Sequence, residues 1–498
     1  MWDPYVLWHA GEFHMIHMVG TNDADYSHRA MCMARSVDGV HWEDLGVIAD
    51  GREPGIPIFA GCFWRAADRF IMNHGSVLSG SGRHSDQCIR FWESPDLQRW
   101  TYRGDDAAVF PDPRWYGTRW DCMDAIPRDG GGFWGYITGD TLDAHPGMSV
   151  GMLQSDDGIE WEAIPPPVIE WGDLPQQMME VGSCERIDGR YYLILGAFNG
   201  YLGNRGYSMF TFVADEPTGP FRPDVDAYRL CGSGPETANW LANFCRTPGA
   251  LLTTNSIAHA CPGPDVWFAP MKRAVVDAAG HLRLHYWEGN DAVRGTPVEF
   301  ARNECELVHP AAADEHRSWQ CTEHGLSVHA KREGFSRLAD GPFSILILPE
   351  PLDVQRGVVI EGTMRLEDTV ADDAIKTHMP PSAVGPYVEH APGSGTAALF
   401  ETSGLTRIAR LAYSDVGVEL SGEDITGPGC ATVRGIPPRQ TCSFRLFLRR
   451  DMMEVYLDDR LAQTCYVATE RTGRVGLVVQ NGACAFENLN IWTMNLEA

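Results

Sequence analysis

The sequence predicts an all-β protein in which a β-propeller is followed by a C-terminal β-sandwich. Two observations predict the propeller: a turn motif that recurs about every 60 residues, and an aromatic-rich strand that recurs between its copies. A third observation, a change in strand character near residue 310, predicts the sandwich. The 3.6-residue period of amphipathic helices is almost absent.

The turn motif occurs as SVDGVHW, SPDLQRW and SDDGIEW at residues 36–42, 94–100 and 155–161, with starts 58 and 61 residues apart. A fourth turn, ADEPTGPF at 214–221, follows about one period later with Phe in place of Trp. We expect each copy to end the outer hairpin of a repeat, with its Asp-Gly pair in the turn and its Trp packed between repeats.

Between these turns lie strands that are entered through Gly or Asp: GEFHMIHM, DRFIMNHG, GFWGYITG, GRYYLILG and, more weakly, GHLRLHYW. Four or five all-β units of this size cannot each bury their own face, and packing such units side by side gives a β-propeller. An array of β-sandwiches is the alternative interpretation of the same repeat.

The repeat ends near residue 310, where VHPAAADEHRSW is typical of a linker. Later segments such as GVVIEGTMRL and MEVYLDD alternate with polar turns, as in a two-sheet sandwich. We therefore assign residues 1–310 to the propeller, 311–325 to the linker and 326–498 to the sandwich.

Composition excludes several classes of function. The formal charge of -27 argues against nucleic acid or an anionic membrane as partner and suits a neutral, polyhydroxylated substrate. Only three lysines occur and none follows a glycine, which excludes a phosphate-binding P-loop. No cofactor or metal is indicated, and the sequence leaves a homo-oligomer open.

The sequence has no run of 18 apolar residues and no signal peptide, which predicts a cytoplasmic protein unless the chain shown is processed. Its 14 cysteines include no C-x-x-C pair, so we expect reduced thiols. The histidines at 9, 14 and 17 could suggest a metal site, but on a strand the last two point to opposite faces.

The C-terminal strands, FRLFLRRDMMEVYLDDR and GRVGLVVQNGACAFENLNIWTM, follow a propeller and in this order resemble glycoside hydrolase family 32, the invertase and fructanase family. Family 43 shares the propeller. The resemblance implies a propeller of five blades, with a catalytic aspartate near the start of blade one. It also implies a second aspartate on blade two or three and a glutamate on the next blade.

Carried over to this sequence, the resemblance implies that Asp3 of Trp2-Asp3-Pro4 is the nucleophile. It implies that Glu180, in MMEVGSCERIDGRYYLI, is the acid/base, and that Asp124, in DCMDAIPRDGGGFWGYITG, binds sugar hydroxyls and stabilises the transition state. The carboxylates that compete for these positions are Asp121 and Asp129 for Asp124, and Glu185 for Glu180.

Trp2, Trp64 and Trp120 are candidates for stacking on sugar rings, although core packing explains each equally well. Asp121 is a further candidate for sugar binding. The sequence also departs from the family pattern, because Met18 stands where a Gln is expected and Met123 precedes the second aspartate where an Arg is expected.

The expected function is a retaining glycosidase or transglycosidase that acts on a furanoside, such as a β-fructofuranoside, with the Asp3 and Glu180 carboxyl groups about 5 to 5.5 Å apart. An inverting arabinofuranosidase or xylosidase of the family 43 type is the alternative, with about 6.5 to 9.5 Å between them. A carbohydrate-binding protein without catalysis is the third hypothesis.

Overall fold

The computed structural model describes residues 2–20, 29–51, 56–77, 86–142, 149–171, 180–198, 206–231, 237–259, 266–308, 317–330, 343–368, 381–414, 417–426, 435–467 and 473–496. The chain forms two compact units. The first contains Met1–Leu230 and Ala238–Asn290, and the second contains Cys231–Thr237 and Asp291–Leu496.

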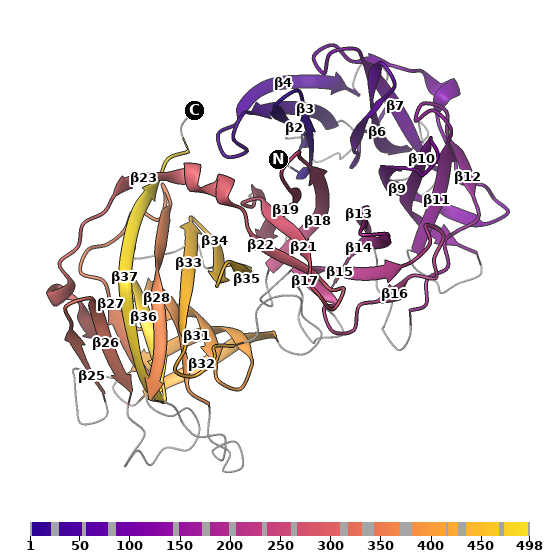
Figure 1. Ribbon diagram of the computed structural model, residues 1–498. Coiled ribbons are helices and arrows are strands. Elements are labelled where there is room, and N and C mark those ends of the chain that lie inside the picture. Colours follow the sequence, from indigo (N-terminus) through magenta and orange to yellow (C-terminus); the bar gives the residue numbers. More distant parts are fainter. Residues whose placement is uncertain are drawn as a thin grey trace. The chain divides into compact units, whose positions relative to one another are not determined.

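The described strands of the first unit follow one another around a ring as a five-bladed β-propeller (Figure 1). Blades one to three are separate four-stranded sheets, and blades four and five are successive parts of one larger sheet. Blade one contains β1 (Trp2–His9), β2 (Glu12–Gly20), β3 (Arg29–Ser36) and β4 (Glu43–Asp50); blade two contains β5 (Phe63–Ala66), β6 (Arg69–Val77), β7 (Gln87–Ser94) and β8 (Thr101–Tyr102). Blade three contains β9 (Tyr116–Pro127), β10 (Phe133–Thr141), β11 (Ser149–Ser155) and β12 (Glu162–Ile164). Blade four contains β13 (Glu180–Ile187), β14 (Arg190–Phe198), β15 (Tyr207–Ala214) and β16 (Arg222–Pro223), with β17 (Arg229–Cys231) also on β15. Blade five contains β18 (Thr237–Arg246), β19 (Leu251–His259), β21 (Lys272–Val276) and β22 (Leu282–Tyr286), with β20 (Val266–Phe268) also on β19.

The turn motif forms the same structure in each of its three copies. In the first copy, Ser36 Oγ accepts a hydrogen bond from the backbone nitrogen of Gly39 at 2.7 Å. Asp38 Oδ1 accepts bonds from the backbone nitrogens of Val40 and His41, each at 2.9 Å. Equivalent bonds to the Asp occur in the copies at 94–100 and 155–161. The motif therefore joins the third and fourth strands of a blade, as predicted.

The tryptophans of this motif pack between blades, which confirms the structural role expected for them. Trp42 of blade one lies 5.7 Å from Phe268 of blade five, measured between ring centroids. Trp161 of blade three lies 5.5 Å from Trp64 of blade two in the same edge-to-face geometry. Such aromatic pairs add to the apolar area that each blade buries against its neighbour.

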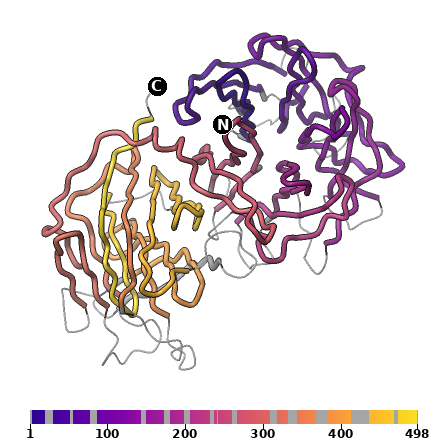
Figure 2. The backbone as a smooth tube through the Cα atoms, in the orientation of Figure 1, coloured from indigo at the N-terminus to yellow at the C-terminus, as the bar shows by residue number. Residues whose placement is uncertain are grey.

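The ring closes where the first strand meets the last blade (Figure 2). Asn243 Nδ2 of β18 donates a hydrogen bond of 2.7 Å to the carbonyl oxygen of Pro4 in β1. Val6 of β1 packs with Leu252 of β19 in one buried apolar cluster. The closure thus fixes β1, which carries Asp3, between blades two and five.

The second unit is a sandwich of two sheets. One sheet has the order β24 (Glu306–Val308), β27 (Phe343–Ile347), β36 (Val475–Gln480), β29 (Ala383–Ala391), β30 (Ser394–Glu401), β31 (Thr406–Ser414) and β32 (Gly417–Thr426). The other has the order β25 (Arg317–Cys321), β26 (Gly325–Ala330), β37 (Gly482–Met494), β28 (Val358–Asp368), β33 (Thr441–Arg449), β34 (Met452–Leu457) and β35 (Arg460–Tyr466), with β23 (Arg294–Pro297) on the end of β37. Short 3-10 helices are η1 (Asp105–Ala107), η3 (Glu288–Val293) and η4 (Arg302–Glu304).

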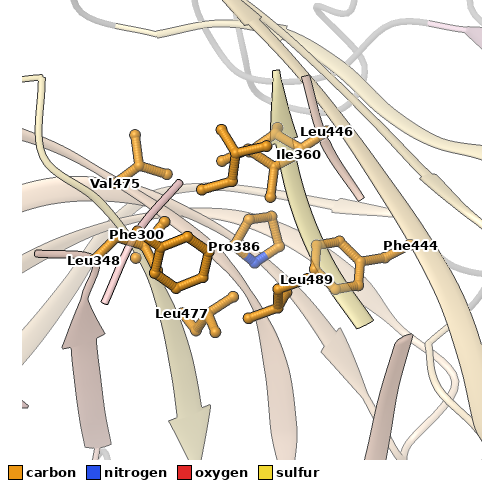
Figure 3. Close-up of a pocket in the computed structure, with 11 residues that line it drawn as sticks. Phe300, Leu348, Ile360, Pro386, Phe444, Leu446, Val475, Leu477 and Leu489 are labelled. Atoms are coloured by element: carbon orange, nitrogen blue, oxygen red, sulfur yellow. The ribbon is translucent and has the colours of Figure 1, made fainter. Parts of the chain in front are cut away.

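Apolar side chains from both sheets fill the space between them. Ile360 and Phe444 come from one sheet, and Leu477 comes from the other. An enclosed apolar cavity of about 10 Å³ remains among these side chains (Figure 3). The alternation noted in the sequence therefore produces the predicted sandwich, with an apolar core between its sheets.

The boundary between the two units differs from the predicted one. The second unit begins at Asp291 rather than at 326, because β23 and β24 pair with the sandwich strands β37 and β27. The segment assigned to the linker, 311–325, contains β25, which pairs with β26. The sequence indicated where the propeller repeat ends, but these short strands have too little alternation to show which sheet they join.

The described cysteines are free thiols. No helix in the part of the chain that the structure describes is long and apolar enough to cross a membrane.

Candidate active site

The strands that carry the candidate carboxylates have a β-bulge beside them. In β1 the pairing with β2 shifts between Trp2 and Tyr5, and Asp3 within this bulge has a φ of 47°. In β9 the pairing with β10 shifts just after Asp121, where Cys122 has a φ of 52°. Bulges bend a strand and change the direction of its side chains, and they are common beside active sites.

The third strand, β13, shows the same feature. Its pairing with β14 shifts between Val181 and Ser183, directly after Glu180. Blades one, three and four therefore each contribute a carboxylate next to an irregular point in the strand.

Arg119 joins two of these carboxylates. Its Nη2 atom lies 3.1 Å from Glu180 Oε1 and 3.4 Å from Asp121 Oδ2. The three side chains are only 13%, 23% and 11% exposed, respectively. Burial lowers the pKa of Arg119, but the charges of Asp121, Cys122 and Glu180 outweigh it, so the net pKa is raised. One cation thus holds together carboxylates from two blades.

Asp3 belongs to the same group of charges. The thiol of Cys122 is buried, and burial is the main cause of its raised pKa. The carboxylates of Asp121, Glu180 and Asp3 raise this pKa further. The cation of Arg119 lowers it, but the net pKa of Cys122 stays well above its ordinary value.

Glu180 has a second partner across the site. Tyr207 Oη of β15 donates a hydrogen bond of 2.9 Å to Glu180 Oε2. Burial first, and then the charge of Glu180, raise the pKa of Tyr207 well above its ordinary value, so the hydroxyl stays protonated and acts as a donor. The Tyr207 ring stacks on Trp240 of blade five at 4.3 Å. Arg119 and Tyr207 therefore hold the two oxygens of Glu180 separately.

Asp124 lies deeper in the propeller wall than its predicted role requires. Its side chain is 1% exposed, and it accepts hydrogen bonds from Tyr5 Oη (2.9 Å), Ser183 Oγ (3.0 Å) and the backbone nitrogen of Cys184 (2.8 Å). Burial raises its pKa to about 6 despite these three bonds, which lower it. A carboxylate enclosed in this way has no surface for a sugar hydroxyl, and Asp121 is the aspartate beside Glu180.

The other competing carboxylates pair with arginines other than Arg119; the side chain of Asp129 is 73% exposed and that of Glu185 is 20% exposed. Asp129 forms an ion pair with Arg186 at 3.0 Å, and Glu185 forms one with Arg246 at 3.0 Å. The Asp129 pair is solvated, and such pairs contribute little to stability.

Two of the predicted sugar-stacking residues are core residues instead. Trp64 is 5% exposed, and its Nε1 donates a 2.9 Å hydrogen bond to the carbonyl oxygen of Gly158. Trp120 is 0% exposed and packs on Tyr116. Neither ring has a free face for a sugar. The side chain of Trp2, the third candidate, lies outside the described residues.

Sequence reasoning did not identify Arg119 and Tyr207 as site residues. The Arg119-Trp120-Asp121 segment does contain an arginine close before an aspartate, which is the signal that was available. Tyr207 has no such signal, because only the packing of β15 against β13 across β14 brings it to Glu180. Among the described residues, no group of three or more His, Cys, Asp or Glu is arranged to hold a metal ion.

Comparison with known proteins gives no matching protein-family model and no match among curated sequences. Solved structures do match. Sucrose-6-phosphate hydrolase from Lactobacillus gasseri has 11% identity and a TM-score of 0.65, over 99% of this chain and 91% of that one. A family GH32 β-fructofuranosidase from Bombyx mori has 12% identity and a TM-score of 0.66, over 100% and 91%. Exo-inulinase from Aspergillus awamori has 12% identity and a TM-score of 0.61, over 100% and 96%.

These matches run through both units of the chain. At such low identity they show the fold, and they confirm the predicted all-β architecture and the resemblance to glycoside hydrolase family 32 at the level of fold.

Proposed function

We propose that the protein is a glycoside hydrolase that cleaves a furanoside by a retaining double displacement. The observation that carries this proposal is that the one cation of Arg119 joins Asp121 of blade three to Glu180 of blade four, while Asp3 lies in the bulge of β1 in blade one. The β-fructofuranosidase and exo-inulinase among the similar structures favour a fructofuranoside as substrate.

In this mechanism the carboxylate of Asp3 attacks the anomeric carbon while the bond to the leaving oxygen breaks. Glu180, as a carboxylic acid, gives its proton to that oxygen. Glu180 then removes a proton from water, and the water oxygen displaces Asp3 from the sugar. The separation of about 5 to 5.5 Å between the two carboxyl groups stays a prediction of this proposal.

Asp121 takes the role first expected of Asp124. Its side chain is 11% exposed beside Glu180, compared with 1% for the residue Asp124, so a sugar hydroxyl that reaches Glu180 also reaches the Asp121 carboxylate. Such bonds orient the ring and strengthen as charge develops on it. Arg119 and Tyr207 fix the direction of Glu180 and Asp121 before the substrate arrives.

The test is the release of reducing sugar from sucrose and inulin, and of p-nitrophenol from aryl furanosides and pyranosides. Asp3→Asn and Glu180→Gln are compared with Asp129→Asn on the surface and with Glu185→Gln, whose carboxylate pairs with Arg246 instead of Arg119. Both controls make the same chemical changes outside the site. We expect the first pair to lose at least roughly 1,000-fold in kcat and the second pair to keep it. Full activity in Asp3→Asn or Glu180→Gln would contradict the assignment.

The anomeric form of the first product, followed by NMR, separates the retaining mechanism from the inverting one. Retention supports Asp3 as nucleophile, whereas inversion would make it the base that activates water. Binding of an oligosaccharide without cleavage would favour the carbohydrate-binding hypothesis.

A further inference from the structure

A second layer of polar side chains lies beneath the carboxylates of the site. Across the bulge in β9, Asp121 is opposite Thr138 and Asp124 is opposite Tyr136. These two partners are two residues apart on β10, so they lie on one face of the sheet. Asp121 and Asp124 therefore project from the same face, as successive layers.

The same arrangement holds in β13. Glu180 is opposite Gly196 and Ser183 is opposite Ile194, two residues apart on β14. Because of the bulge, the side chains of Glu180 and Ser183 project from the same face of the sheet, and Ser183 belongs to the second layer.

The carboxylate of Asp124 connects the strands of this second layer. It accepts one hydrogen bond from Tyr5 of β1 and two from β13, through Ser183 Oγ and the backbone nitrogen of Cys184. Ser183 Oγ also accepts a bond of 3.3 Å from the backbone nitrogen of Phe244 in β18, which extends the network to blade five.

In each of the three strands, the residue that takes part in this network lies two or three positions from the site residue of the same strand. Tyr5 is two residues from Asp3, Asp124 is three residues from Asp121, and Ser183 is three residues from Glu180. A buried carboxylate is costly, and apolar residues of the same volume often pack at lower cost. The chain nevertheless places one at the point where these three strands meet.

We propose that Asp124 is a positioning residue, whose carboxylate ties β1, β9 and β13 together and so sets the spacing of Asp3, Asp121 and Glu180. This inference rests on the proposed function for its kinetic consequences. It assigns Asp124 no contact with the substrate, in contrast to the role implied by the family resemblance.

The kinetic test removes the donors and leaves the carboxylate in place, with Tyr5→Phe, Ser183→Ala and the double variant. The matched control is Tyr192→Phe, which removes a 2.9 Å bond from Tyr192 Oη to the carbonyl oxygen of Gly280, another long-range contact in the propeller. Circular dichroism and thermal unfolding show which variants are folded at the assay temperature.

We expect the double variant to lose roughly 10- to 100-fold in kcat with KM little changed, because misplaced catalytic groups slow the chemical step more than they weaken binding. The control should keep its kcat. A double variant that is folded and keeps the kcat of the unmodified protein would overturn the inference.

A crystal structure of the double variant makes the test independent of activity. We expect the side chains of Asp3, Asp121 and Glu180 to move relative to one another by about 1 Å, while the turn at Gly280 stays in place. Unchanged positions would overturn the inference even if no substrate is cleaved. If the unmodified protein cleaves nothing but the three side chains do move, the proposed function fails and the positioning role stands.

Discussion

The two units of the protein bury their strands in different ways. The interior of the sandwich is an apolar cluster, in which Ile360, Phe444 and Leu477 are each less than 5% exposed. The inner strands of the propeller bury polar groups as well, among them Asn73 at 0% and Asp124 at 1% exposed. The contrast is therefore between the apolar cluster inside the sandwich and the polar network where the propeller strands β1, β9 and β13 meet, although the sandwich sheets also bury charged groups such as Glu401 beside Arg407.

This difference shows where burial serves stability and where it serves geometry. An apolar core gains free energy from each side chain removed from water and tolerates repacking. A buried polar group gains little net free energy, and it stays favourable only while its partners hold their positions. Asn73 illustrates this, because its Nδ2 donates to the carbonyl oxygen of Met123, in the bulged segment of β9. Polar burial therefore fixes the strands that carry the site.

The strongest test on the apolar side is Phe444→Ala. Phe444 is 3% exposed and borders the small cavity of the sandwich, so its truncation should lower the free energy of unfolding by about 3 to 5 kcal/mol. Urea unfolding measures this loss, and kcat/KM per folded molecule should not change. Phe444→Leu is the milder control. Loss of kcat/KM in folded Phe444→Ala would contradict the expectation that the apolar core of the sandwich affects stability and not activity.

Asp121→Asn is the counterpart on the polar side. The substitution keeps the shape but removes the charge that faces Arg119, so kcat/KM should fall by roughly 100-fold while the melting temperature changes little. Steady-state kinetics on the best substrate of the glycoside panel measures the loss. A fall in stability without a fall in kcat/KM would show that Asp121 serves packing only.

The pH dependence of stability sharpens the comparison further. Burial raises the pKa of Asp124 to about 6, so between about pH 4 and 6 the folded chain binds more protons than the unfolded one. The contribution of Asp124 to stability is therefore complete below about pH 4 and is lost as the pH rises through 6, by roughly 2 to 3 kcal/mol.

Urea unfolding at several pH values, compared between the unmodified protein and Asp124→Asn, isolates this contribution. The variant should show a smaller fall in stability over the same window. Parallel pH profiles would mean that Asp124 titrates near its ordinary value in the folded protein.

The smallest effect is expected for Trp64→Phe. The variant keeps an aromatic ring in the interface between blades but loses the hydrogen bond to Gly158, which should cost about 1 kcal/mol of stability. KM for the substrate should stay the same. A several-fold rise in KM would restore Trp64 as a sugar-binding residue.

The sequence was sufficient for the fold because the repeat is local. The Ser-x-Asp turn and the following Trp recur in the outer hairpins of blades one to three, and together with the recurring aromatic strands they predict a propeller. Asp3 and Glu180 were assigned to one site from the family resemblance; each lies beside a bulge in the first strand of its blade, and their separation stays a prediction.

The rest of the site depends on features that strand periodicity does not show. In a regular strand Asp121 and Asp124 would point to opposite faces, and only the bulge at Cys122 places them on the same face in different layers. The burial of Trp120 could not be predicted from the sequence either, because residue type alone does not distinguish a tryptophan packed in the core from one that stacks on a sugar.

The closure of the ring by β1 also affects how the site is made during synthesis. Asn243 and Pro4 are separated by 239 residues, so the strand that carries Asp3 finds its last neighbour only after blade five has been translated. Contacts between such distant parts of a chain form slowly, and until then both edges of the open propeller are exposed to other chains. A nascent chain would consequently hold its three carboxylates long before it could use them, and activity would appear in a single late step of folding.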